Sequence, residues 1–468
     1  MINFVTTWLL PFIVVLGAAV ILHEFGHFIV AKLFKIRVET FSVGFGPRLF
    51  GKKFGDTDYR VSAIPLGGYV KLGGDESNAP IEGEGACDIP AQERFDLRPR
   101  WQRISVALAG PIMNILTALA IPFAAGLMYG VPTTPTPVVS SVTSGGAAEV
   151  AGLRPGDRIV SFNGNLNPEW DTISGDALLS PGEPLPMIVD RNGQQLNLTI
   201  KPKPLTVDGE TAGDLEFIPD YGQVLVVIAD VSPGSPAEAA GLKGGDRVVA
   251  IGGQAARSSE QVIQYIRAHK DEPLAIDVNR QGQPLQVTVR IPPGQQIIGV
   301  HIGQRVPFVR VGPIAAGKYA VDSNVRIIRL TGKALGQVFQ GKRSVRNTLS
   351  GPIGIARESS RVVSELGWAG MFTMLAFLSL NLGVFNLLPI PVLDGGAIFL
   401  LLIEGALAIF GMTISMRVRE RIQQVGFVFV ILLMVFVLTN DTLKQISLWR
   451  GSNNSPPAAS PAPGSPSK

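Results

Sequence analysis

Long apolar stretches alternate with polar segments along this chain of 468 residues. A membrane-spanning helix needs about 20 mainly apolar residues. Four stretches approach or exceed that length, at approximately residues 4–31, 104–128, 371–388 and 425–438. The pattern therefore predicts a polytopic α-helical membrane protein with four transmembrane spans.

The apolar segment between the third and fourth stretches, residues 386–410, is interrupted. Pro389, Pro391, Gly395 and Gly396 lie within it. Proline removes a backbone donor and breaks a helix. Broken helices are tolerated at membrane depth where they line a buried cavity. We therefore expect this break to face the inside of the helix bundle.

The segment between the second and third stretches contains an internal repeat. Residues 145–164 match 234–253, and residues 189–200 match 278–289, both at an offset of 89 residues. Each copy predicts short β-branched strands, Gly-Asp turns and a short helix. The shared pattern A-x-x-A-G-L-x-x-G-D-x-[IV] resembles the PDZ domain. We therefore expect two PDZ domains inserted between the spans.

Residues 321–340 place Val325, Ile328, Leu335 and Val338 at helical spacing, which predicts an amphipathic helix. It either lies on the outer membrane face or packs on a PDZ domain, and the sequence leaves both placements open. The C-terminal tail is rich in Ser, Pro and Ala, which predicts disorder.

The motif HEFGH lies inside the first apolar stretch, at residues 23–27. On a helix, His23 and His27 lie one turn apart on the same face, close enough to share one Zn²⁺. Glu24 lies about 100° further around the helix, where it reaches a metal-bound water instead of the metal. Ionisable groups are costly in a membrane-length helix, so they favour a functional site over a chance match. We predict one zinc ion, with Glu24 as the base that deprotonates the water.

A zinc site of this kind needs a third protein ligand and an open fourth position. Asp394 is the preferred candidate, because the surrounding prolines and glycines distort the chain and let its carboxylate point into the bundle. Its alternative role is a helix N-cap. Glu404 is the second candidate, although a helix-end charge explains it more simply. His269 and His301 lie in the external segment, where they do not easily reach the motif.

Composition supports a membrane protein and excludes some other classes. Hydrophobic residues make up 46% of the chain and charged residues 17%. The net charge of +4 is not gathered in a basic stripe with interleaved aromatics, so we expect no nucleic-acid partner. The single cysteine, Cys87, excludes an intramolecular disulfide and a thiolate zinc cluster.

Basic residues gather in the segments that follow the first stretch, precede the second and precede the fourth. The positive-inside rule places these segments in the cytoplasm. The N-terminus, the PDZ pair and the C-terminus then lie outside. Lys32 marks the cytoplasmic edge of the first span, so His23 lies about 13 Å into the bilayer. We expect the site to open to the cytoplasmic side.

Several motifs together resemble the site-2 protease family of intramembrane zinc metalloproteases. They are HEFGH, GFGP at 44–47, GPIMN at 110–114, the tandem repeat, and N-x-x-P-x-P-x-x-D-G-G at 386–396. The resemblance implies that His23, His27 and Asp394 bind the zinc ion. It also implies that Glu24 is the catalytic base and that Asn386 helps to hold the substrate backbone.

The same resemblance implies a role for residues 59–74, YRVSAIPLGGYVKLGG. Two short alternating strands flank Gly67 and Gly68, which is typical of a β-hairpin. In relatives such a hairpin enters the membrane and offers an edge strand to the substrate. The substrate-binding residues would then be Gly67, Gly68 and Tyr69. A helical peptide bond is shielded by its own hydrogen bonds, so a clamp for extended backbone makes physical sense.

The implied function is hydrolysis of peptide bonds within or near the transmembrane segment of single-span proteins already trimmed on the periplasmic side. The implied substrates are an anti-sigma factor of an envelope stress response and remnant signal peptides, in a bacterial inner membrane. Membrane lipid is the other expected partner, and we expect no small-molecule cofactor.

Two other classes compete with the protease. One is a non-catalytic, PDZ-bearing membrane scaffold with a structural metal, which has no need of Glu24 beside its first histidine. The other is a transporter, which predicts inverted repeats of spans, and the sequence shows none.

The fold predicted is thus a multi-domain helical membrane protein with two inserted, mainly β domains. Its parts are residues 1–130 (spans one and two with the hairpin), 131–220 (first PDZ), 221–307 (second PDZ), 308–366 (amphipathic linker helices), 367–449 (spans three and four with the third ligand) and 450–468 (disordered tail).

Overall fold

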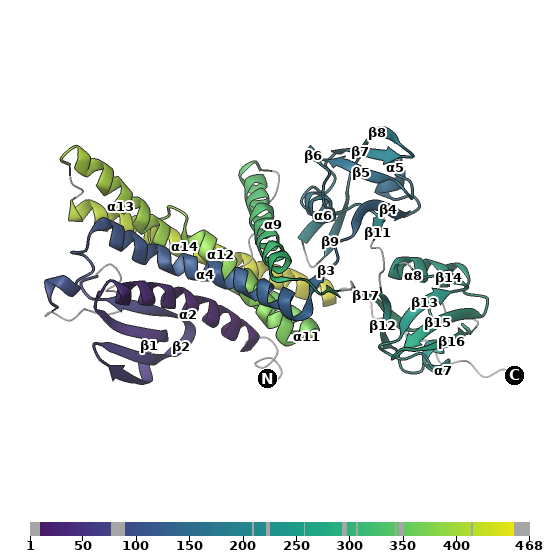
Figure 1. Cartoon of the computed structure of the whole chain (residues 1–468), viewed down its shortest axis with the longest axis horizontal. Helices are drawn as coiled ribbons and strands as arrows, with labels where there is room; N and C mark the ends of the chain where they lie inside the picture. The colour runs from purple at the N-terminus through teal and green to yellow at the C-terminus, as the bar shows by residue number, and fades with distance from the viewer. Residues whose placement is uncertain are drawn as a thin grey trace. The chain divides into compact units, whose positions relative to one another are not determined.

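The structure is a computed structural model (Figure 1), described here for residues 10–75, 89–207, 210–220, 225–256, 258–292, 297–305, 308–341, 344–345, 351–412 and 415–453. The chain divides into two compact units. The membrane unit consists of residues 1–126 and 313–468, and the sheet unit of residues 127–312. Cys87 and the tail from residue 454 lie outside the described residues.

The membrane unit contains, among the described residues, four helices that are long and apolar enough to cross a membrane. They are α2 (Leu10–Leu33), α4 (Arg100–Tyr129), α12 (Trp368–Asn386) and the central part, Arg421–Lys444, of α14 (Met416–Asn453). Each forms because a long, mainly apolar run satisfies its backbone internally, as a lipid environment requires. Each of the four predicted apolar stretches corresponds to one of these helices.

The predicted break between the third and fourth spans is present. Helix α12 ends at Asn386, and helix α13 (Asp394–Ile409) begins eight residues later. Between them Val392 has a φ of 82°, a left-handed conformation that is unfavourable for a β-branched residue. This turn places Asp394 in the first turn of α13, so that its side chain starts from the break itself.

Helix α9 (Pro313–Phe339) contains the predicted amphipathic segment. Its buried residues are Ala316, Ala320 and Asn324, and Asn324 Nδ2 donates a hydrogen bond of 3.0 Å to the carbonyl of Ala118 in α4. The sequence did not predict this contact between α9 and α4. Val325 and Ile328 remain exposed, and the placement of that face on the membrane surface stays a prediction.

Strands β1 (Val38–Phe54) and β2 (Thr57–Leu72) form an antiparallel sheet in the membrane unit. Residues 58–61 and 68–72 of β2 both pair with the first part of β1, on opposite sides of it. Val43, for example, pairs with Val61 on one side and with Gly68 on the other. The predicted hairpin with its turn at Gly67-Gly68 is therefore wrong. Turn residues show where a chain bends, but they do not show which strand each arm pairs with.

Helix α2 contacts β2, α11 (Pro352–Leu366) and α12. Two glycines bring it against α4 as well. An added Cβ at Gly26 would lie 2.2 Å from the carbonyl oxygen of Ala109, and one at Gly110 would lie 2.3 Å from His27 Nε2. Small residues let helix backbones approach closely in membranes. The HEFGH segment is thus enclosed between the sheet and the neighbouring helices.

The described residues of the sheet unit form two six-stranded sheets with the same strand arrangement. The first has the order β11-β4-β5-β7-β8 with β6 beside β5, and the second has the order β17-β12-β13-β15-β16 with β14 beside β13. Each sheet is accompanied by two helices, α5 (Ala147–Val150) and α6 (Trp170–Leu178) in the first, α7 (Pro236–Ala239) and α8 (Ser259–Ala268) in the second.

The strands of the first sheet are β4 (Thr136–Val142), β5 (Arg158–Phe162), β6 (Asn165–Leu166), β7 (Leu185–Arg191), β8 (Gln194–Ile200) and β11 (Phe217–Asp220). Those of the second are β12 (Leu225–Val231), β13 (Arg247–Ile251), β14 (Gln254–Ala255), β15 (Leu274–Arg280), β16 (Gln283–Val289) and β17 (Val300–Arg305). Two further pairs are β9 (Lys203–Val207) with β10 (Glu210–Asp214), and β3 (Val131–Pro132) with β18 (Phe308–Val309).

The two sheets share their buried cores at the 89-residue offset of the sequence repeat. Phe162 corresponds to Ile251, Met187 to Ile276, and all four are buried. An ion pair repeats in the same way. Arg191 Nε donates to Asp157 Oδ1 at 2.7 Å in the first copy, and Arg280 Nε donates to Asp246 Oδ1 at 2.7 Å in the second.

Each of these arginines binds its aspartate through two nitrogens. Its Nη2 donates to the second carboxylate oxygen and to the carbonyl of Gly152 or Gly241. Burial raises the pKa of Asp157 and Asp246, but the hydrogen bonds from the arginine and from a backbone amide outweigh it and hold each pKa below its usual range. Both carboxylates are fully satisfied structural groups.

Candidate metal centre

Helix α2 places the two histidines of the motif one turn apart, as the spacing predicts. His23 is buried, and its Nε2 lies 3.2 Å from Nε2 of His27. The imidazole rings meet edge to face, with centroids 4.8 Å apart. Both Nε2 atoms therefore point at one spot beside the helix.

Asp394 reaches the same spot from the start of α13. Its Oδ2 lies 3.0 Å from His23 Nε2, and its Oδ1 lies 3.5 Å from His27 Nε2. One ligand atom from each of the three residues fits within 4.8 Å of the others. Glu404, the second candidate, instead forms an ion pair with Arg419. The structure thus brings Asp394, and not Glu404, to the histidine pair.

The donor set fits a tetrahedral metal ion. Zinc–nitrogen and zinc–oxygen bonds of about 2.0–2.1 Å place neighbouring tetrahedral ligands roughly 3.3 Å apart. The two Nε2 atoms are 3.2 Å apart, and Asp394 approaches one with Oδ2 at 3.0 Å and the other with Oδ1 at 3.5 Å, distances close to that spacing. When both histidine Nε2 atoms are unprotonated, as metal ligands must be, the buried Asp394 Oδ2 receives no hydrogen bond from the described residues. A buried carboxylate oxygen without a donor is costly, and a cation would satisfy it.

Glu24 lies beside this cluster without belonging to it. Its Oε2 accepts a hydrogen bond of 3.1 Å from the backbone N–H of Val70 in β2. This contact links the glutamate to the strand of residues 68–72. The sequence did not predict it, because a backbone donor leaves no residue-specific signal.

The predicted substrate-binding residues are divided between two places. Gly67, Gly68 and Tyr69 are buried in β2, and Tyr69 stacks on Phe45 with centroids 6.0 Å apart. A Cβ at Gly67 would lie 2.6 Å from the Phe45 ring, which explains the glycine there. Asn386, at the end of α12, has its Nδ2 3.3 Å from His23 Nε2.

Helix α4 contacts the outer nitrogen of both histidines. His27 Nδ1 lies 2.7 Å from the carbonyl oxygen of Val106, and His23 Nδ1 lies 3.2 Å from Asn114 Nδ2. Neither Val106 nor Asn114 was assigned a role from the sequence. Asn114 is the last residue of the GPIMN motif. The sequence signal that could have marked it is a polar residue within an apolar span, four residues after Gly110.

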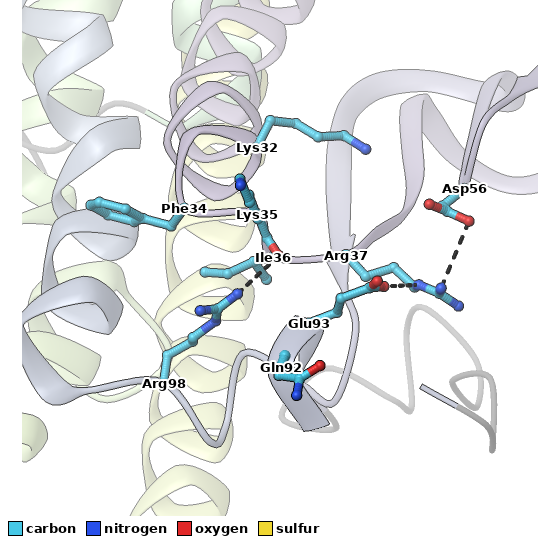
Figure 2. A pocket seen from close by; sticks show the side chains of 9 residues that line it. All are labelled: Lys32, Phe34, Lys35, Ile36, Arg37, Asp56, Gln92, Glu93 and Arg98. Carbon is cyan, nitrogen blue, oxygen red and sulfur yellow. Dashed lines mark hydrogen bonds and ion pairs between the residues drawn. The ribbon is translucent and has the colours of Figure 1, made fainter. Parts of the chain in front are cut away.

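A separate pocket of about 450 Å³ lies at the C-terminal end of α2 (Figure 2). It is lined by Lys32, Phe34, Lys35, Ile36, Arg37, Asp56, Gln92, Glu93 and Arg98. Arg37 Nε donates to Glu93 at 2.7 Å, and Arg98 Nη2 donates to the carbonyl of Lys35 at 2.9 Å (Figure 2). These bonds hold the end of α2 to the segment before α4. The pocket shares no residue with the His-Asp cluster.

The fold and the cluster define a class: a helical membrane protein with a His-His-Asp centre and an adjacent glutamate. A sequence profile described as Peptidase family M50 matches residues 11–433, and the chain belongs to this family of site-2 metalloproteases. The resemblance found in the sequence is therefore confirmed, and so is the assignment as a metalloprotease.

Curated relatives match over nearly the full chain. The regulator of sigma-E protease RseP of Escherichia coli strain K12 is 33% identical over 456 residues, covering 92% of this chain and 98% of the relative. The protease RseP of Yersinia pestis is 33% identical over 457 residues, with the same two coverages. A Vibrio cholerae protein provisionally named a zinc metalloprotease is 33% identical over 463 residues, covering 92% of this chain and 97% of the relative.

Proposed function

We propose that this chain is an intramembrane zinc metalloprotease that cuts within or near the transmembrane segment of single-span proteins. The observation that carries the proposal is the convergence of His23, His27 and Asp394 among apolar, membrane-length helices, with Glu24 beside them. The name of the Vibrio cholerae relative supports zinc as the metal.

His23, His27 and Asp394 would hold one zinc ion and leave its fourth position open. When bound, zinc polarises a carbonyl and lowers the pKa of a coordinated water to about 7. Glu24 takes the proton of the attacking water and passes it to the leaving amine. The Val70 N–H holds the glutamate carboxylate in place for this transfer.

The sheet offers a surface for an extended substrate. Residues 68–72 pair with β1 on one side, and the Val70 N–H points away from β1 towards Glu24. A peptide added along that edge would run past the catalytic base. We propose that Gly67, Gly68 and Tyr69 shape this edge and that Asn386 holds the substrate backbone from the other side.

Substrate helices of different stiffness test this clamp. A poly-Leu transmembrane substrate should be cut slowly, and the same substrate with Gly or Asn near the scissile bond quickly, because only the second unwinds readily. Equal cleavage rates for these two substrates, measured both in detergent and in liposomes, would refute the strand clamp.

The two repeated sheet domains are, in this proposal, periplasmic PDZ domains that exclude substrates with large external domains. Neither copy contains a Gly-Leu-Gly-Phe-type carboxylate loop, which argues against capture of a C-terminus. The substrates would then be proteins already trimmed outside, such as an anti-sigma factor or a remnant signal peptide. Cleavage should fall when a folded domain is fused to the external end of a substrate, and should recover when the two sheet domains are deleted.

We place the protein in a bacterial inner membrane, with the N-terminus, the sheet domains and the C-terminus in the periplasm. The basic residues at the end of α2, gathered around the pocket in Figure 2, support a cytoplasmic location for that end. Cysteines introduced in the β1–β2 turn should react with a membrane-impermeant thiol reagent, added from the periplasmic side, only after the membrane is permeabilised.

Glu24→Gln tests the catalytic assignment and separates it from a scaffold with a structural metal. Zinc content should remain at the wild-type level, while cleavage of a model transmembrane substrate falls by at least about 100-fold, because the general base is lost. Cleavage that persists would overturn the role of Glu24. A wild-type protein that holds zinc and cleaves nothing would favour the scaffold.

A further inference from the structure

The two histidines of the centre differ in the partner of their outer nitrogen. His27 Nδ1 faces the carbonyl oxygen of Val106, which only accepts hydrogen bonds. This contact fixes the hydrogen on Nδ1 and leaves a free electron pair on Nε2, the form that binds a metal. His27 is therefore preset as a ligand by the backbone of α4.

The partner of His23 is a side-chain amide, which both donates and accepts. In the structure Asn114 Nδ2 faces His23 Nδ1 at 3.2 Å, while Asn114 Oδ1 is buried and has no hydrogen-bond partner among the described residues. With the amide nitrogen facing Nδ1, a neutral His23 carries its hydrogen on Nε2, which lies 3.0 Å from Asp394 Oδ2 and 3.3 Å from Asn386 Nδ2. In that tautomer His23 cannot bind a metal through Nε2.

A half-turn of the Asn114 amide exchanges its oxygen and nitrogen with almost no change in shape. The unpaired Oδ1 then accepts the hydrogen of His23 Nδ1, and the electron pair on Nε2 becomes free. The turn pairs the buried oxygen and completes the ligand set in one movement, and it moves Nδ2 to the position where Oδ1 has no partner among the described residues. Asn114 is fully buried, so water does not compete for either atom.

We propose that Asn114 is a positioning residue that holds His23 in the metal-binding tautomer through its Oδ1. The proposal deepens the zinc site of the proposed function and rests on it. It also gives a role to GPIMN: Gly110 makes room for the imidazoles, and Asn114, one turn later on the same helix, orients one of them.

Zinc affinity provides the first test, measured by chelator competition on the full chain. Asn114→Leu removes the acceptor at similar volume and should weaken zinc binding by about 10- to 100-fold. Asn114→Asp keeps an oxygen acceptor and should remain within about threefold of the wild type, since carboxylates commonly support zinc-bound histidines. Thr117→Val is the matched control, because the Thr117 hydroxyl donates to the Met113 carbonyl of its own helix, and it should leave the affinity unchanged.

Nitrogen NMR on histidine-labelled protein gives a second readout that needs no Asn114 variant. The chain has four histidines, so the His23 signal is assigned by comparison with His23→Gln. In the zinc-loaded wild type, His23 should carry its hydrogen on Nδ1. A hydrogen on Nε2 of zinc-loaded His23, or equal zinc affinity in Asn114→Leu and the wild type, would overturn the proposal. A wild type that binds no zinc would instead overturn the proposed metal site itself.

Discussion

Asp157 and Asp246 in the sheet unit can be compared with Asp394 in the membrane unit, because all three are carboxylates with buried oxygens. Each sheet-unit aspartate has an arginine on both oxygens and a backbone N–H as well. Asp394 has two imidazoles beside it, and its Oδ2 has no donor among the described residues once both Nε2 atoms are unprotonated.

The difference separates structural charge from functional charge. A buried ion pair that satisfies all its atoms holds a fold in register, and nothing further needs to bind. A buried cluster that directs two imidazole nitrogens and a carboxylate at one spot is incomplete without a cation. Substitution of Asp394 should therefore change metal binding, whereas disruption of the sheet-unit ion pairs should change stability.

Asp394→Asn should give the largest effect, on metal binding. Structural zinc sites are worth about 10–16 kcal/mol, so the loss of one of three ligands should cost about 4 kcal/mol, or roughly 1000-fold in affinity. Metal content after dialysis against a chelator measures the loss. Asp157→Asn is the matched control, and it should keep its zinc. Unchanged zinc in Asp394→Asn would move the third ligand elsewhere.

Arg191→Met should affect stability and not metal binding. Removal of the arginine leaves the Asp157 carboxylate, which is 1% exposed, without its partner. Such a loss is destabilising, because it leaves the aspartate charge uncompensated. Calorimetry should show the first sheet domain melting earlier, while zinc content stays constant. Arg280→Met should do the same for the second domain, and a change in zinc content in either variant would contradict the separation of roles.

Gly110→Ala crowds the metal cluster without removing any ligand. The new methyl group would lie 2.3 Å from His27 Nε2, so the imidazole must move. We expect zinc affinity to fall by about 10- to 100-fold, or about 1.4–2.7 kcal/mol. Gly332→Ala, in helix α9, is the control, since nothing lies within 4 Å of its added Cβ. Equal zinc affinity in both variants would count against the close contact.

The pH dependence of the two ion pairs should be the smallest effect. The folded-state pKa of Asp157 and Asp246 is depressed, so their contribution to stability is complete above the unfolded pKa of about 3.9 and is lost as the pH falls through the folded value. Calorimetry between pH 6 and pH 3 should show the melting difference between wild type and Arg191→Met shrinking below about pH 4. A constant difference would mean that the pair does not lower the pKa.

Local spacing along the chain was enough to predict several features of the protein. Four apolar runs predicted the four apolar helices, because a lipid-length run satisfies its backbone only as a helix. His23 and His27 lie on one face because they are four residues apart, and the 89-residue repeat anticipated two sheets with matching cores. The break at Pro389 and Pro391 pointed to Asp394 because closely spaced prolines and glycines disfavour a helix, although α4 accommodates the well-separated Pro111 and Pro122.

Tertiary packing, in contrast, established which distant groups meet. The β1–β2 pairing is an example: the turn expected at Gly67-Gly68 joins no hairpin, because 58–61 and 68–72 both pair with β1. The contacts of Val106 and Val70 are made by a backbone carbonyl and a backbone N–H. Nearly every residue has both groups, so the residue type does not show which ones form such contacts. Asn114 became informative only when α4 was placed against α2, because a hydrogen bond depends on positions in space that spacing along one helix does not contain.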